Sequence, residues 1–431
     1  MSSNRRVLDY AGAARAVAPR RLLVGSLIVY FMALAVAPVV SSIQPNAVGI
    51  FYWFLVAGGA ILGLSISRPT SPLLGAASGA DLLRGARRTT YLGTIGVLLL
   101  FFERYGIRGA PLEWDFFAVR AALEDTATGF IGTTAGFLAA FAPLGVMMGL
   151  LAGAHGARVP WRLHLLAGLV LLAYVAASLA TGGRSVLLVI VLIHVLAMIY
   201  LRRLSGRTVN AVVVGGVLLA FCGLALASAS MMLERLAQTG LDPMFSIESS
   251  GYAEWLQPAP SALATMQSNS EWTPLLGSFF SLAQYVFHGF FEFNVLYTDF
   301  TSRHTLGGFT LWLPIKIISL IIGTNMNVDP DLLVGWRSGI FTTFIGPIYV
   351  DFGWAAPPLI AALFWALSWP ARRLALGDVR FFPAASVVGC VVILFPVVNL
   401  LLSASGTYPF VAALTIPLLA KPRREANKNA C

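Results

Sequence analysis

Charged side chains are scarce in this sequence, where they make up 11% of the 431 residues against 58% for hydrophobic side chains. Soluble domains carry about 25% charged residues, so this composition excludes an ordinary soluble protein. Apolar runs of about 17–25 residues recur along the chain, and that length suits a helix that crosses a bilayer. Alternation of apolar and polar residues with period 2 is absent, which favours helices over a closed barrel. The sequence therefore predicts an all-α, polytopic transmembrane bundle.

Cysteine and the common catalytic motifs are also lacking. Cys222 and Cys390 lie within apolar runs and Cys431 ends the chain, so there is no disulfide framework and no CxxC metal spacing. There is no Walker loop, no zinc-type His/Glu spacing, no GxSxG motif and no adjacent Asp pair. We therefore expect neither a metal nor a cofactor. The net charge of +10 does not indicate nucleic-acid binding, because the basic residues occupy short gaps rather than one stripe.

Ten apolar runs are predicted to span the membrane, at residues 22–40, 50–66, 89–103, 129–154, 164–181, 185–201, 209–230, 354–371, 381–402 and 405–420. Basic residues concentrate in alternate gaps: Arg5, Arg6, Arg15, Arg20 and Arg21; Arg68, Arg84, Arg87 and Arg88; Arg158 and Arg162; Arg202, Arg203 and Arg207; Arg372, Arg373 and Arg380; and Lys421, Arg423, Arg424 and Lys428. By the positive-inside rule, these gaps and both termini are cytoplasmic. No convincing cleavage site follows Arg21, so the first run is expected to remain as an anchor.

The opposite side is dominated by one long segment. Residues 231–353 contain ten Asp or Glu and only four Lys or Arg, so they are predicted to form an external loop, with a second external segment at 104–128. The chain then divides into an N-terminal bundle of seven spans (1–230), the large loop (231–353) and a C-terminal bundle of three spans with a basic tail (354–431). Within the loop, 276–298 and 307–323 are apolar enough to cross, which would give twelve spans. We favour interfacial or re-entrant helices for both.

Arginines on the external side run against the orientation rule, so they are candidates for function. Arg184 follows two glycines in a minimal turn between spans, where a guanidinium beside a helix N-terminus is suited to an anion. The alternative is that Arg184 contacts lipid headgroups. Arg104, Arg108 and Arg120 lie in the predicted external segment 104–128. The alternative for these three arginines is neutralisation by nearby acids.

The large loop supplies further candidates. A carboxylate at a membrane boundary is costly unless it is solvated, paired or used, and Asp351 stands at such a boundary two residues after Tyr349. The alternative for the aromatic residues there is an interfacial belt. The other candidates of the loop are His288, Glu292, Arg303 and Arg337.

Three of these regions resemble the Wzy-type O-antigen polymerases, a bacterial family that polymerises oligosaccharide repeat units. Residues 103–109, with the segment to Arg120, are similar to the first external loop of the family. Residues 181–185 are similar to its small-small-Arg turn. The stretch from Gln284 to 346–353 is similar to its large periplasmic loop, which ends on a Tyr-x-Asp-x-Gly pattern. Together these regions fall within residues 90–370.

The resemblance implies a GT-C-like fold in the bacterial inner membrane with a periplasmic active face. The substrates would be undecaprenyl-diphosphate-linked oligosaccharides, and the growing glycan would pass from its lipid diphosphate to a new lipid-linked unit without a metal or nucleotide. Expected partners are a flippase and a chain-length regulator. The leaving diphosphate needs fixed positive donors, for which the candidates are Arg184, Arg108, Arg120, Arg104, Arg337 and Arg303. The candidate catalytic residues are His288, Glu292, Asp351 and Tyr349.

Two alternative functions share this architecture. An O-antigen ligase would hand the glycan to a lipid A core, but the ending Tyr349-x-Asp351-x-Gly353 favours a polymerase. A flippase or transporter of lipid-linked glycans would place polar residues in mid-span, often in broken helices. The predicted spans carry almost none, and His194, the main exception, is interpreted as a packed core residue.

Overall fold

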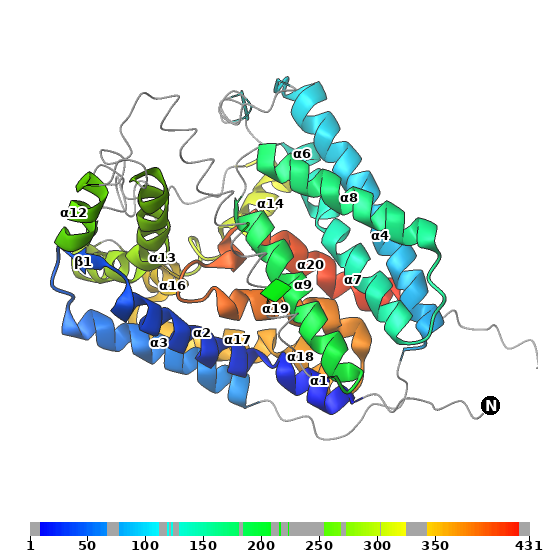
Figure 1. The fold of residues 1–431 in the computed structure, drawn as a ribbon, viewed down its shortest axis with the longest axis horizontal. Helices are drawn as coiled ribbons and strands as arrows, with labels where there is room; N and C mark the ends of the chain where they lie inside the picture. Colours follow the sequence, from blue (N-terminus) through cyan, green and yellow to red (C-terminus); the bar gives the residue numbers. More distant parts are fainter. Residues whose placement is uncertain are drawn as a thin grey trace, which may run out of the picture.

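The computed structural model describes residues 9–66, 77–111, 119, 122–123, 129–180, 184–207, 215–216, 223, 254–268, 273–301, 303–324 and 343–421, which are mostly helical (Figure 1). The first half contains α1 (Tyr10–Ala16), α2 (Pro19–Val36), α3 (Ala47–Ser65), α4 (Gly79–Phe101), the π-helix η1 (Phe102–Ile107), α6 (Phe130–Ala139), α7 (Phe141–Ala154), α8 (Trp161–Ala180) and α9 (Arg184–Leu204). The second half contains α12 (Pro260–Ser268), α13 (Thr273–Asp299), α14 (Trp312–Ile322), α16 (Ile345–Phe352), η3 (Gly353–Ala355), α17 (Ala356–Leu367), α18 (Trp369–Ala375), η4 (Val379–Phe381), α19 (Phe382–Ile393), η5 (Leu400–Leu402) and α20 (Ala404–Leu419).

Six helical stretches in the described part of the chain are long and apolar enough to cross a membrane. They are Tyr10–Val36, Ala47–Ser65, Phe130–Ala154, Trp161–Ala180, Ser185–Leu204 and Ile345–Ala375. This confirms a mostly helical bundle with the character of a membrane protein. Ten spans and the division into seven and three stay predictions, and the predicted span 209–230 lies almost entirely outside the described residues.

A small antiparallel sheet of two three-residue strands accompanies the predicted all-α bundle. Strand β1 (Val39–Ser41) pairs with β2 (Leu256–Pro258), and the side-chain amide of Gln284 on α13 donates to the Leu256 carbonyl at 2.9 Å. Helix α2 ends at Val36 rather than at 40, because Pro38 disfavours the helical conformation for the residue before it. The sheet brings the first external gap and the large loop to the same end of the bundle.

Several of the predicted cytoplasmic gaps lie at the end of the bundle that is far from β1. The Asp9 amide donates to the Leu204 carbonyl at 3.2 Å, which joins the N-terminal segment to the end of α9. Arg88 near the start of α4 donates to the Leu419 carbonyl at the end of α20 at 2.8 Å. In Figure 1, α1 and α18 also lie side by side there, far from β1. Several of the basic gaps therefore lie together, and the membrane topology stays a prediction.

Helix α4 begins ten residues before the predicted span 89–103. Ser78 and Asp81 form a capping box, in which the Ser78 hydroxyl accepts from the Asp81 amide and the Asp81 carboxylate accepts from the Ser78 amide. Burial opposes ionisation of this carboxyl, but the hydrogen bonds from Ser78 and the ion pair with Arg84 lower the pKa of Asp81. The span prediction missed these turns because they are polar.

Helix α19 ends well before the predicted limit of its span, 381–402. Pro396 has no amide hydrogen and cannot donate to the carbonyl of Val392 four residues earlier. The hydroxyl of Ser26 on α2 donates to that carbonyl instead, at 3.1 Å. After Ile393, residues 394–403 leave the α-helix and contain only the short turn η5 before α20 begins. In a membrane protein, a neighbouring hydroxyl that takes up a freed backbone group makes such a break tolerable.

Two other predicted spans are also interrupted. The span 129–154 breaks at Ala140 into α6 and α7, because Pro143 cannot donate to the carbonyl of Ala139. The helical run predicted to begin at 354 begins at Ile345 instead, and it turns at Gly353, where φ is +51°. Residues predicted to end the external loop therefore belong to α16.

Small residues allow the long helices to approach closely. A Cβ added to Gly96 of α4 would lie 2.1 Å from the Ala139 nitrogen of α6. A Cβ on Gly63 of α3 would lie 2.2 Å from the Ala361 oxygen of α17. Backbone contact through small residues is the usual way in which membrane helices associate.

Candidate functional site

An arginine group lies where α4 continues into η1. Glu103 is 4% exposed, and Arg108 forms an ion pair with it, with the guanidinium nitrogen 3.5 Å from the carboxylate oxygen. Arg104 donates to the carbonyl of Ala177 on α8 at 2.6 Å. Burial lowers the pKa of the Arg104 guanidinium, against the opposing effect of Glu103, and an arginine still remains charged at any physiological pH. A buried carboxylate thus pairs with Arg108 and acts electrostatically on Arg104 at the end of a predicted span.

The contact between Arg104 and Ala177 places this group beside the last turn of α8. Helix α8 ends at Ala180 and α9 begins at Arg184. A separation of four residues limits the distance between their Cα atoms to about 14 Å. Two predicted arginine sites therefore lie at the same end of the bundle. The side chain of Arg184 and the whole of Arg120 fall outside the described residues.

Helix α13 carries a buried polar row. Gln284, His288 and Glu292 follow one another at intervals of four residues and are 1%, 1% and 2% exposed. Nδ1 of His288 lies 3.0 Å from the Gln284 carbonyl oxygen and 2.9 Å from that of Tyr285. A carbonyl only accepts, so Nδ1 carries the proton, and the lone pair of the neutral ring is on Nε2. The tautomer suits His288 to proton acceptance.

Asp351 is fully buried, and its carboxylate organises the turn that leads into α14. Its two oxygens accept from the hydroxyl of Thr305 and from the amides of Phe309 and Thr310, the amides at 2.9 and 2.5 Å. The same turn holds Leu306 at φ +52°, a conformation uncommon for a side chain with a Cβ. This geometry gives Asp351 a positioning task. Its predicted part in catalysis stays a prediction.

Tyr349 belongs to a cluster of aromatic side chains rather than to an exposed belt. It is 9% exposed, and its ring centroid lies 5.1 Å from Tyr297 and 5.2 Å from Tyr52. The Tyr52 hydroxyl donates to the Gly353 carbonyl at 2.6 Å, and Nδ1 of His304 lies 3.0 Å from the Val350 carbonyl oxygen. Sequence reasoning missed Tyr52 and Tyr297, because neither stands in a motif or near a charge.

The structure thus separates the predicted residues into two sets. Figure 1 shows α13 and the α4–α8 pair lying apart, with α14 between them in this view. Of the loop arginines, Arg303 is exposed between α13 and α14, and Arg337 lies outside the described residues. Among the described residues, no three His, Cys, Asp or Glu side chains come together in a way that could hold a metal ion.

Comparison of the chain with protein-family models, with curated proteins and with solved structures finds no match. The family resemblance of the sequence therefore remains a prediction. The assignment of function depends on the two sets of residues above and on the membrane character of the bundle.

Proposed function

We propose that the protein is a glycosyltransferase that polymerises undecaprenyl-diphosphate-linked oligosaccharide repeat units at the periplasmic face of the inner membrane. The observation that carries the proposal is the contact of Arg104 with Ala177, at 2.6 Å. It brings the cations of η1 to the last turn of α8, and α9 begins with Arg184 four residues after that helix ends. This end of α8 is away from the basic gaps. Arginines here therefore do not serve to orient the protein in the membrane by the positive-inside rule.

The proposed reaction exchanges one sugar bond for another. A hydroxyl oxygen of the new lipid-linked unit attacks the anomeric carbon of the growing glycan, and the bond from that carbon to the diphosphate breaks. The bonding electron pair goes to the diphosphate oxygen, and the hydroxyl proton goes to a base or to water. Arginines stabilise the charge that develops on the diphosphate, and one preorganised donor of this kind is worth about 2.7–4 kcal/mol of barrier.

The separation of the two sets of residues decides the roles that we assign. Since α13 lies apart from the arginine group, leaving-group stabilisation by Arg104, Arg108 and Arg184 is the main catalytic contribution. His288 and Glu292 are then assigned to binding the acceptor glycan away from the reacting carbon, because a proton acceptor would have to lie within hydrogen-bond reach of the attacking hydroxyl. The exposed Arg303, together with Arg120 and Arg337, is assigned to substrate capture.

A strain that carries altered copies of the gene tests the proposal. A deletion strain should make surface glycan of one repeat only, and Arg184→Ala should reproduce this phenotype at normal protein level. Arg158→Ala is the matched control, since Arg158 is exposed at the basic end and should be silent. A deletion strain that lacks every glycan-bearing lipid would contradict polymerisation and favour the ligase or the flippase.

One observation favours the second candidate, a flippase for lipid-linked glycans. The unwound segment after α19 meets the start of α16 through a parallel bridge between Val398 and Thr343. Asn399 beside it is 3% exposed, and its Nδ2 has no hydrogen-bond partner among the described residues. Broken helices with buried polar groups are typical of transporters. Purified protein in liposomes distinguishes the two: a flippase moves single lipid-linked units across the bilayer, whereas a polymerase joins them.

A further inference from the structure

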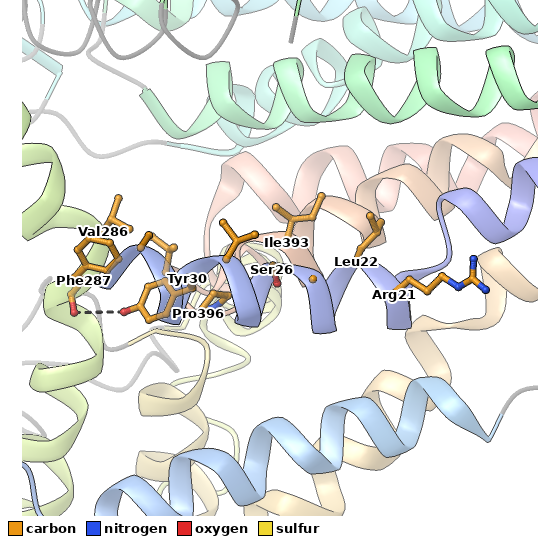
Figure 2. Close-up of a pocket in the computed structure, with 12 residues that line it drawn as sticks. Arg21, Leu22, Ser26, Tyr30, Val286, Phe287, Ile393 and Pro396 are labelled. Carbon is orange, nitrogen blue, oxygen red and sulfur yellow. Dashed lines mark hydrogen bonds between the residues drawn. The ribbon is translucent and has the colours of Figure 1, made fainter. Parts of the chain in front are cut away.

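A groove of about 480 Å³ runs along α2, between α13 and the segment that follows α19. Figure 2 shows its lining side chains in a row, with Arg21 at one end and Val286 and Phe287 at the other. Volumes of roughly 300–1,000 Å³ are typical of sites for small ligands. The groove involves none of the residues assigned to glycan transfer above, so the inference does not rest on that proposal.

The dimensions of the groove suit one hydrocarbon chain. Its lining on α2 extends from Arg21 to Ala33, and twelve helical residues rise about 18 Å. One leaflet of a bilayer contributes about 15 Å of hydrocarbon, half of the apolar core. A chain that enters at the level of Arg21 therefore reaches the end of the groove near the middle of the membrane.

The walls offer an apolar surface, because their hydroxyl groups are already engaged. Ser26 donates to backbone carbonyls, among them that of Val392 at 3.1 Å. The hydroxyl of Tyr30 donates to the carbonyl of Phe287 at 3.4 Å, as the dashed line in Figure 2 shows. Gly25 leaves the floor open, since a Cβ added there would meet no atom within 4 Å. The groove is thus suited to an alkyl chain and not to a sugar.

Arg21 is the one charged residue of the lining. It is exposed, and its guanidinium donates to the carbonyl of Arg15 at 3.5 Å. No carboxylate pairs with it among the described residues. This end of the groove is therefore positively charged. The position of the charge fixes which end of an amphiphile belongs there: the anionic headgroup lies at Arg21 and the apolar chain lies towards Phe287.

We propose that this groove binds an anionic phospholipid from the leaflet at the basic end of the bundle, with the phosphate on Arg21 and an acyl chain along α2. Basic sites between helices on this side of a membrane are known sites for acidic lipids. An isoprenoid carrier from the opposite leaflet would keep its phosphate at the far membrane surface, beyond the Phe287 end of the groove, and would leave Arg21 without an anion. The bound chain contacts Pro396 and Val397, so the lipid stabilises the unwound segment after α19.

Native mass spectrometry of the purified full chain tests the proposal, with phosphatidylglycerol and phosphatidylcholine of identical acyl chains as probes. The wild-type protein should retain phosphatidylglycerol about five-fold better than phosphatidylcholine, as expected for one cation at the membrane surface. Arg21→Ala should remove this preference. Gly25→Leu should abolish retention of both lipids by filling the groove. If Gly25→Leu does not fold, Val29→Trp serves the same purpose, since Val29 lines the groove and is 66% exposed.

Two matched variants control for charge and size. Arg20→Ala removes an exposed arginine that does not line the groove, and Gly58→Leu adds the same bulk at a glycine of α3 with open space around it. Both should behave as wild type. The proposal is overturned if wild-type protein retains the two lipids equally. It is equally overturned if the groove-filling variants keep phosphatidylglycerol, or if undecaprenyl phosphate displaces it from wild type and from Arg21→Ala alike.

Discussion

Replacing Asp351 by asparagine removes a charge from a fully buried site without changing its shape. One carboxylate oxygen accepts from both Thr305 and the Phe309 amide, whereas the other accepts from the Thr310 amide alone. The asparagine oxygen should occupy the first position, where it keeps two donors, and the amide nitrogen then faces the N–H of Thr310. A buried donor left without an acceptor costs about 1–3 kcal/mol. At about 1.4 kcal/mol for each factor of ten, this corresponds to roughly a 5–140-fold change in local opening.

Hydrogen exchange of single amides measures this opening directly. In Asp351→Asn, the Thr310 amide should exchange faster by that factor, and the Phe309 amide should change less because its acceptor remains. Asp299→Asn is the control, since Asp299 is an exposed carboxylate at the end of α13 and should leave both amides unchanged. Equal exchange of Thr310 in Asp351→Asn and wild type would refute the assignment of the carboxylate as the organiser of this turn.

Three further predictions concern packing, a buried hydrogen bond and pH. Gly96→Ala should lower the unfolding temperature in detergent, because its Cβ would lie 2.1 Å from the backbone of α6 and overpacking costs about 1–3 kcal/mol; Gly58→Ala, in open space, should not. Tyr52→Phe should cost about 1–3 kcal/mol by leaving the buried Gly353 carbonyl unpaired, and an unchanged unfolding temperature would contradict the 2.6 Å hydrogen bond. Because the pKa of Asp81 is lowered on folding, its contribution exists above the unfolded pKa of about 3.9 and is lost as pH falls through the folded value. Asp81→Asn should therefore destabilise the protein at pH 7 and differ little from wild type in strong acid, as thermal unfolding at both pH values would show.

The sequence named candidate residues, but the partners of those residues came only from the structure. It placed Arg104 and Arg184 outside the basic gaps, and the contact of Arg104 with Ala177 brings their segments to one end of the bundle. It treated Asp351 as a candidate catalytic group because a carboxylate at a membrane boundary needs a reason. The amides that occupy this carboxylate come from residues more than forty positions earlier. No local sequence pattern identifies such donors. The sequence alone therefore left open whether Asp351 is a paired carboxylate or a catalytic one.

The interruptions of the helices have the same origin. Hydropathy predicts one continuous span through 381–402, since residues 391–398 around Pro396 are all apolar. The proline is visible in the sequence. The cost of the break, however, depends on which group donates a hydrogen bond to the carbonyl of Val392. Ser26, from the other end of the chain, supplies that donor at 3.1 Å. Without such a partner the break would be costly in hydrocarbon.

The sequence by itself determined that this chain is mostly helical with the character of a membrane protein, and it predicted which of its gaps share one side. The physical reason is that both properties are sums over local composition: run length against bilayer thickness, and basic residues against the two sides of the membrane. Only the tertiary structure decided the pairing of β1 with β2, the hydrogen bonds to the Asp351 carboxylate, the break after Ile393 and the groove at Arg21. Each of these depends on one donor, acceptor or empty volume contributed by a distant part of the chain, and no average over neighbouring residues contains that information.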